Sequence, residues 1–201
     1  MSSLFANLAL LLGGGAVAAL LYRQAQPLPQ RSLHYMFALA ALSLALAALG
    51  RLVLTPSGSE QQTLQLMLDN LAYYAGLPMI ASVAIAHGWN RQWSRAAWGR
   101  WMLGLFALFE LVRRSDIGVL YSQGLALLTC LALLAGVLKG FRGPTRLYAL
   151  AGTLLLAFGL LAFGPAPLMA GLQQDALYRF ALAGCIILCG YSFSRTPQTR
   201  T

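Results

Sequence analysis

The polar side chains best suited to chemistry form a compact group within a long apolar stretch of this chain. Asp69 and Tyr73 stand four residues apart, with Asn70 and Tyr74 beside them. With about 3.6 residues per helical turn, this spacing places Asp69 and Tyr73 on the same helix face. Pro78 follows and lacks a backbone donor, which predicts a kink that frees a carbonyl group. A carboxylate, an amide and two phenols on one helix indicate a polar binding site.

A second segment repeats this pattern. Residues 174–184 read QDALYRFALAG and bring Asp175, Tyr178 and Arg179 within about one helical turn. Glu110 is a third isolated acid, between the two segments. We therefore predict that the ligand-binding residues are Asp69, Asn70, Tyr73, Tyr74, Glu110, Asp175, Tyr178 and Arg179.

Two interpretations of these charged residues remain open. Two facing carboxylates, from Asp69 and Asp175, could bind a cation, share a proton or act as an acid and a base. The structural alternative is that the acids neutralise nearby arginines. Asp175 and Arg179 have the spacing of a helical ion pair, and Glu110 has it with Arg113 or Arg114.

Nothing in the sequence indicates a catalytic residue, a metal site or a cofactor. There is no Gly-x-Ser-x-Gly motif, no Ser-His pair and no Gly-Asp protease signature. His34 and His87 fit no metal-ligand pattern and are expected at an interface. Cys130, Cys185 and Cys189 lie inside apolar stretches, so we expect no structural disulfide. An enzyme is therefore the less favoured class.

The elements that carry these residues are apolar stretches of membrane-spanning length. Hydrophobic residues make up 59% of the chain and charged residues 9%, which leaves too little polar surface for a soluble domain. The net charge of +9 comes from single basic residues at span ends, so nucleic-acid binding is not expected. The predicted fold class is an all-α polytopic membrane protein with seven transmembrane helices, at about 4–22, 33–54, 64–86, 96–113, 117–138, 147–163 and 176–193.

Charge distribution predicts the orientation of these spans. With the N-terminus outside, ten basic residues fall on the cytoplasmic side and four on the outer side. We therefore expect a multi-pass inner (plasma) membrane protein, N-out and C-in, with a flexible cytoplasmic tail at 195–201. All five acids then lie on the outer side, and an aromatic belt lies on the cytoplasmic side, formed by Trp89, Trp93, Trp98 and Trp101.

The two similar segments also predict an internal repeat. Residues 1–194 are expected to form a single domain whose halves, about 4–87 and 116–194, are parallel repeats around the helix at about 96–113. This 3+1+3 plan resembles, in topology alone, PQ-loop sugar carriers and microbial rhodopsins. The last span has no retinal-binding lysine, and Pro29-Gln30 and Pro197-Gln198 lie outside the spans, so no family is identified.

The leading functional hypothesis is an outward-facing polar pocket that binds or transports a small polar solute, a cation or a lipid headgroup. The alternative is a non-catalytic structural or assembly subunit of a membrane complex. A third hypothesis is a lipid-acting hydrolase that uses the paired aspartates. The expected partners are the lipid bilayer, one of these ligands and another protein or a second copy of the chain, with no nucleic acid.

Overall fold

The computed structural model describes residues 2–25, 32–54, 58–113, 118–165, 167 and 173–195, and these residues contain helices and no strand. Each predicted span is a helix in this structure. The elements are α1 (Ser2–Ala25), α2 (Ser32–Val53), α3 (Ser59–Asn70), η1 (Leu71–Gly76), α4 (Leu77–Gly88), α5 (Arg95–Arg113), α6 (Gly118–Gly140), α7 (Pro144–Phe158), η2 (Gly159–Phe163) and α8 (Asp175–Arg195). The tail predicted to be flexible begins at the last residue of α8 and otherwise lies outside the described residues.

Among the described residues, six helical segments are long and apolar enough to cross a membrane, which indicates a multi-pass membrane protein. One of them is continuous through α3, η1 and α4, from Ser59 to Gly88. The exception among the long helices is α5, because Arg95, Arg100, Glu110 and Arg113 interrupt its apolar sequence.

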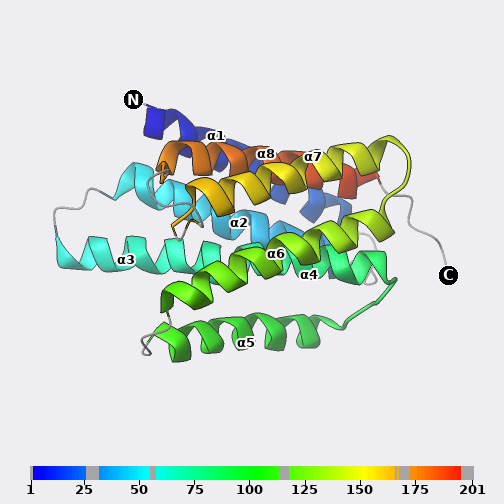
Figure 1. Cartoon of the computed structure of the whole chain (residues 1–201), viewed down its shortest axis with the longest axis horizontal. Coiled ribbons are helices and arrows are strands. Elements are labelled where there is room, and N and C mark those ends of the chain that lie inside the picture. The colour runs from blue at the N-terminus through cyan, green and yellow to red at the C-terminus, as the bar shows by residue number, and fades with distance from the viewer. Residues whose placement is uncertain are drawn as a thin grey trace.

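The six apolar segments pack in a closed ring, and α5 lies outside it (Figure 1). Around the ring, α1 contacts α2, α2 contacts α4, α4 contacts α6, α6 contacts α7, and α7 contacts α8, which returns to α1. Successive long helices run in alternating directions, so α4 and α6 are parallel neighbours with α5 running back between them in sequence. The first turns of α3 project beyond the ends of the other helices.

Glycines allow α4 and α6 to approach closely. A Cβ atom on Gly136 of α6 would lie 2.6 Å from the carbonyl oxygen of Ala84, and one on Gly88 would lie 2.9 Å from the carbonyl oxygen of Gly136. Only a residue without a side chain fits such a backbone contact. At the C-terminal ends of α4 and α6, the Lys139 ammonium lies 4.2 Å from the centre of the Trp89 ring.

The helix that carries Asp69 contains a π-helical segment, η1, immediately before Pro78. Leu77 donates its N–H to the carbonyl of Ala72, five residues back. Pro78 has no N–H, and its ring would clash with the carbonyl four residues back in an α-helix. The wider π turn accommodates the proline while the helix continues.

Trp98 does not lie in the exposed aromatic belt to which the sequence analysis assigned it. Its side chain is fully buried against Trp93, with ring centres 4.8 Å apart. Trp89, Trp93 and Trp101 remain exposed at this end of the bundle.

Candidate functional site

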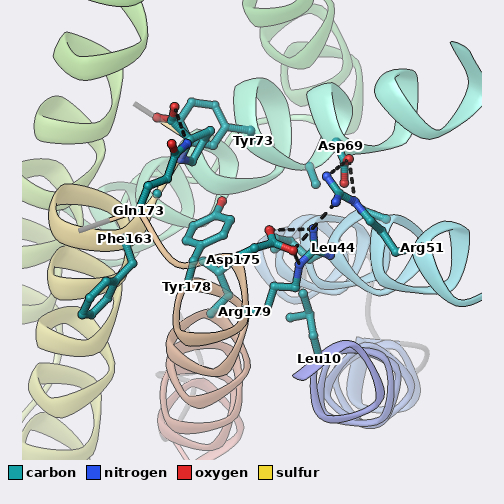
Figure 2. A pocket seen from close by; sticks show the side chains of 15 residues that line it. Leu10, Leu44, Arg51, Asp69, Tyr73, Phe163, Gln173, Asp175, Tyr178 and Arg179 are labelled. Atoms are coloured by element: carbon teal, nitrogen blue, oxygen red, sulfur yellow. Dashed lines mark hydrogen bonds and ion pairs between the residues drawn. The ribbon is translucent and has the colours of Figure 1, made fainter. Parts of the chain in front are cut away.

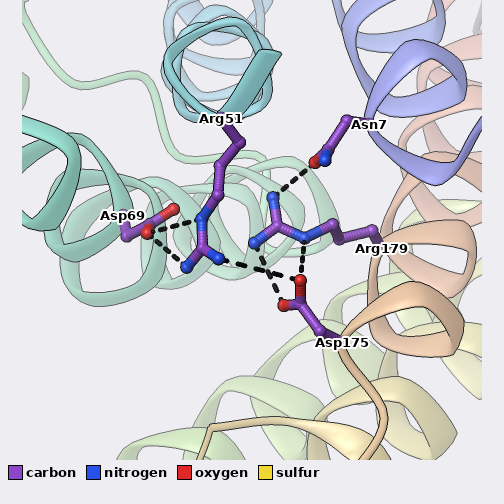
Figure 3. A network of polar contacts seen from close by, with 5 residues as sticks. All are labelled: Asn7, Arg51, Asp69, Asp175 and Arg179. Atoms are coloured by element: carbon purple, nitrogen blue, oxygen red, sulfur yellow. Dashed lines mark hydrogen bonds and ion pairs between the residues drawn. The ribbon is translucent and has the colours of Figure 1, made fainter. Parts of the chain in front are cut away.

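Charged side chains from three helices meet near one end of the ring (Figure 3). Arg51 comes from the last turn of α2, Asp69 from α3, and Asp175 and Arg179 from the start of α8. Asn7 of α1 adds an amide. Two arginines and two aspartates balance, so the cluster has no net formal charge.

Arg179 forms the buried half of this cluster. Its Nε and Nη2 atoms each donate a hydrogen bond of 3.0 Å to the Asp175 carboxylate, and Nη1 donates one of 2.6 Å to Oδ1 of Asn7. The Arg179 side chain is only 5% exposed, whereas that of Asp175 is 51% exposed. Asp175 also lies in the first turn of α8, where the helix dipole favours a negative charge. All three nitrogens of this guanidinium therefore have partners, which holds Arg179 in place.

Arg51 and Asp69 form a more open pair. Nε and Nη2 of Arg51 donate to the same oxygen, Oδ2 of Asp69, at 3.0 and 2.6 Å. Nη1 of Arg51 has only a 3.8 Å contact with Oδ2 of Asp175. Among the described residues, no donor bonds to Oδ1 of Asp69. This pair is also partly exposed, with 34% of the Arg51 side chain and 24% of the Asp69 side chain accessible.

The four charged residues line one pocket with a volume of about 360 Å³ (Figure 2). Tyr178 and Tyr73 line the same pocket. Apolar side chains supply much of the remaining wall, from Leu10, Leu44, Phe163 and Leu182. The segment η2 ends at Phe163 and is followed by Gly164 and Pro165, which also line the pocket. A few charged groups on an apolar wall are typical of small-molecule sites.

Five of the eight predicted site residues line this pocket, and three do not. Those in the pocket are Asp69, Tyr73, Asp175, Tyr178 and Arg179.

Asn70, Tyr74 and Glu110 lie elsewhere. Tyr74 stacks on Phe109 of α5 with ring centres 3.9 Å apart, and its hydroxyl is 2.7 Å from Oγ of Ser122. Asn70 is half-buried on α3, and Glu110 is half-buried on α5. The proposed pairing of Glu110 with Arg113 or Arg114 lies outside the described side chains.

Among the described residues, the structure adds four polar residues that the sequence reasoning did not assign to the site. Gln173 lines the pocket (Figure 2). Arg51 pairs with Asp69, Asn7 accepts from Arg179, and the backbone oxygen of Ser122 accepts a 3.2 Å hydrogen bond from the hydroxyl of Tyr73. Asn7 is a lone amide in an apolar span, a pattern that itself indicates a polar partner. For Ser122 the sequence offers no comparable signal.

The geometry does not favour chemistry on a directly shared carboxylate pair. The Arg51 guanidinium contacts both Asp69 and Asp175, so a cation already lies between them. Within the described ranges, no three His, Cys, Asp or Glu residues are grouped as metal ligands. His87 is at the other end of its span from Asp69 and packs on Phe141 and Phe193, with ring centres 5.0 and 5.3 Å away.

Comparison of the chain with protein-family models, with curated proteins and with solved structures gives no match. Function is therefore inferred from the pocket itself.

Proposed function

We propose that this chain is a membrane protein whose end pocket binds a small polar solute that carries both a positive and a negative group. A free amino acid, a betaine or a zwitterionic headgroup has this chemistry. The observation that carries the proposal is the open Arg51–Asp69 pair, whose residues line one pocket. Nη1 of Arg51 and Oδ1 of Asp69 each have no hydrogen-bond partner among the described residues.

The two arginines have different roles in this proposal. Arg179 is buried and bonded through all three guanidinium nitrogens, so it holds Asp175 and the start of α8 in place. Arg51 is partly exposed, and its Nη1 atom is available to the anionic group of a ligand. The Asp69 carboxylate attracts the cationic group through its charge, while Tyr73 and Tyr178 contact the body of the ligand. A ligand with one charge leaves one of these two groups unpaired.

We also propose that α5 crosses the membrane, so that the chain has seven spans in the inner membrane, N-out and C-in. The parallel arrangement of α4 and α6 supports this proposal. Two consecutive spans with the same direction require the chain between them to return across the bilayer, and α5 is the helix between them. The order of contacts around the ring also fits a parallel repeat, since α4–α6 and α8–α1 are equivalent junctions between the two halves.

The binding proposal is tested by Asp69→Asn in purified protein. We expect glycine betaine, a zwitterion, to raise the melting temperature more than choline or acetate, which each carry one of its charges. Asp69→Asn should weaken betaine binding about tenfold or more, because it removes the negative charge that balances the trimethylammonium group. The purified yield should remain that of the wild type. Thermal shift and isothermal titration calorimetry measure the two effects.

Glu60→Gln is the matched control. It removes an acid from the exposed first turn of α3 and makes the same change in net charge outside the pocket. Unchanged betaine affinity in Asp69→Asn, or an equal response to all three compounds in the wild type, would contradict the proposal.

The second candidate function is a structural subunit of a membrane complex. It is favoured by the fact that each aspartate already pairs with an arginine. In this case Asp69→Asn lowers the folded yield, and none of the three compounds changes the melting temperature. The same experiment therefore distinguishes the two functions.

A further inference from the structure

A second hollow lies between α4, α5 and α6, away from the charged pocket. This groove has a volume of about 620 Å³ and is lined largely by apolar side chains, among them Ala81, Ile85, Leu105, Leu108, Leu125 and Leu128. It shares no lining residue with the charged pocket.

The groove exists because α5 stands away from the ring. The glycine contact holds α4 and α6 together, whereas α5 packs mainly on η1, where Phe109 stacks on Tyr74. Toward the other end of α5, Nε1 of Trp101 donates a 3.0 Å hydrogen bond to Oγ of Ser82 on α4. These two contacts hold α5 in place at both ends of the groove. The groove between them is therefore a fixed feature of the fold.

One end of the groove is basic and aromatic. Arg91 follows α4 and lines the groove together with Trp93 and Trp101. Its side chain is exposed, and among the described residues no carboxylate pairs with it. Trp93 and Trp101 are 40% and 42% exposed, with ring centres 6.3 Å apart. A cation beside exposed indoles is the arrangement that proteins use at the level of lipid headgroups.

We propose that this groove binds one phospholipid with an anionic headgroup, with an acyl chain between α5 and the ring and the phosphate at Arg91. The length of the groove matches this occupant. Its lining on α6 runs from Tyr121 to Ala132, about 16 Å at about 1.5 Å per residue. One leaflet of a bilayer core is about 15 Å thick, half of the usual 30 Å. The groove is therefore at least as long as one acyl chain, and the headgroup would lie at its Arg91 end.

Gly124→Leu tests this proposal because Gly124 lines the groove and a Cβ atom there meets no atom within 4 Å. Leucine is therefore expected to fit the fold and to fill the groove. In native mass spectrometry of delipidated protein titrated with phosphatidylglycerol, the wild type should bind one lipid. Gly124→Leu should bind that lipid about tenfold more weakly or worse. Gly99→Leu is the control, since Gly99 on α5 is equally open and does not line the groove.

Arg91→Gln tests the charge separately, at an exposed position that does not endanger folding. The wild type should prefer phosphatidylglycerol to phosphatidylcholine about fivefold, the effect of one basic residue near a membrane surface, and Arg91→Gln should abolish this preference. Equal binding of the two lipids by the wild type, or unchanged binding by Gly124→Leu, would overturn the proposal. Neither result depends on the charged pocket.

Discussion

Two arginines with the same charge occupy very different environments in this structure. Arg179 is 5% exposed and bonded through three nitrogens, whereas Arg51 is 34% exposed and bonds a single carboxylate oxygen. Removing the partner of a buried charge leaves that charge without compensation, and water replaces the partner of an exposed charge. The same kind of mutation should therefore have different consequences at the two pairs.

We expect Asp175→Asn to reduce the free energy of unfolding by about 2–4 kcal/mol, below the range for a fully buried pair because Asp175 is half exposed. Asp69→Asn should cost about 1 kcal/mol or less. Denaturation of both purified variants in the same detergent measures the difference. Equal losses of unfolding free energy would contradict the distinction between the structural Asp175–Arg179 pair and the Arg51–Asp69 pair that is proposed to bind a ligand.

At the same scale, the sequence predicts some contacts and not others. The Asp175–Arg179 pair follows from four-residue spacing on one helix, and the structure contains it. The Arg51–Asp69 pair joins two helices, so it depends on how α2 and α3 pack. No spacing within one helix encodes that contact. Tyr74 points toward α5 and α6 for a related reason, since the π turn changes the helix register between Asp69 and Pro78.

At the scale of elements, helix positions were predictable and their close contacts were not. Apolar length and the charges at span ends indicated where each helix lies. The glycine crossing of α4 and α6 depends on two residues far apart in the chain, Gly88 and Gly136. Other glycines in the same helices, such as Gly124, have open surroundings. Sequence alone does not separate these two kinds of glycine.

Gly136→Ala should reduce the free energy of unfolding by about 1–3 kcal/mol, because its Cβ atom overlaps the backbone of Ala84 and forces the helices apart. Gly104→Ala on α5 is the control, since nothing lies within 4 Å of its Cβ atom. There we expect no loss, or a gain of up to about 1 kcal/mol from helix propensity. Thermal denaturation of the two variants checks this, and similar behaviour would show that the crossing tolerates a methyl group.

For the whole molecule, the unusual element is α5, a full-length helix outside a closed ring. Its charged residues exclude it from the most apolar helices. The distribution of basic residues in the sequence predicts that it crosses the membrane. It did not indicate that α5 lies apart from the other helices.

Cysteine labelling tests the seven-span arrangement. Asn90→Cys and Arg142→Cys place thiols at exposed sites that precede α5 and follow α6. If α5 crosses the membrane, both thiols lie on the cytoplasmic side, and an impermeant maleimide labels them only after lysis. Ser59→Cys, at the exposed start of α3, should react in intact cells. The native cysteines are buried and should react slowly. Labelling of Asn90→Cys and Arg142→Cys from opposite sides would show that α5 does not cross.

The π turn before Pro78 makes the charged pocket sensitive to the length of the chain. The π turn holds one more residue than an α-helical turn. If the segment became α-helical at the same chain length, α3 would rotate by about 100° relative to α4, and Asp69 would turn away from Arg51 although every residue of the pocket would still be present. Deleting one residue between Leu71 and Gly76 would remove the surplus residue and let an α-helix keep Asp69 on its present face.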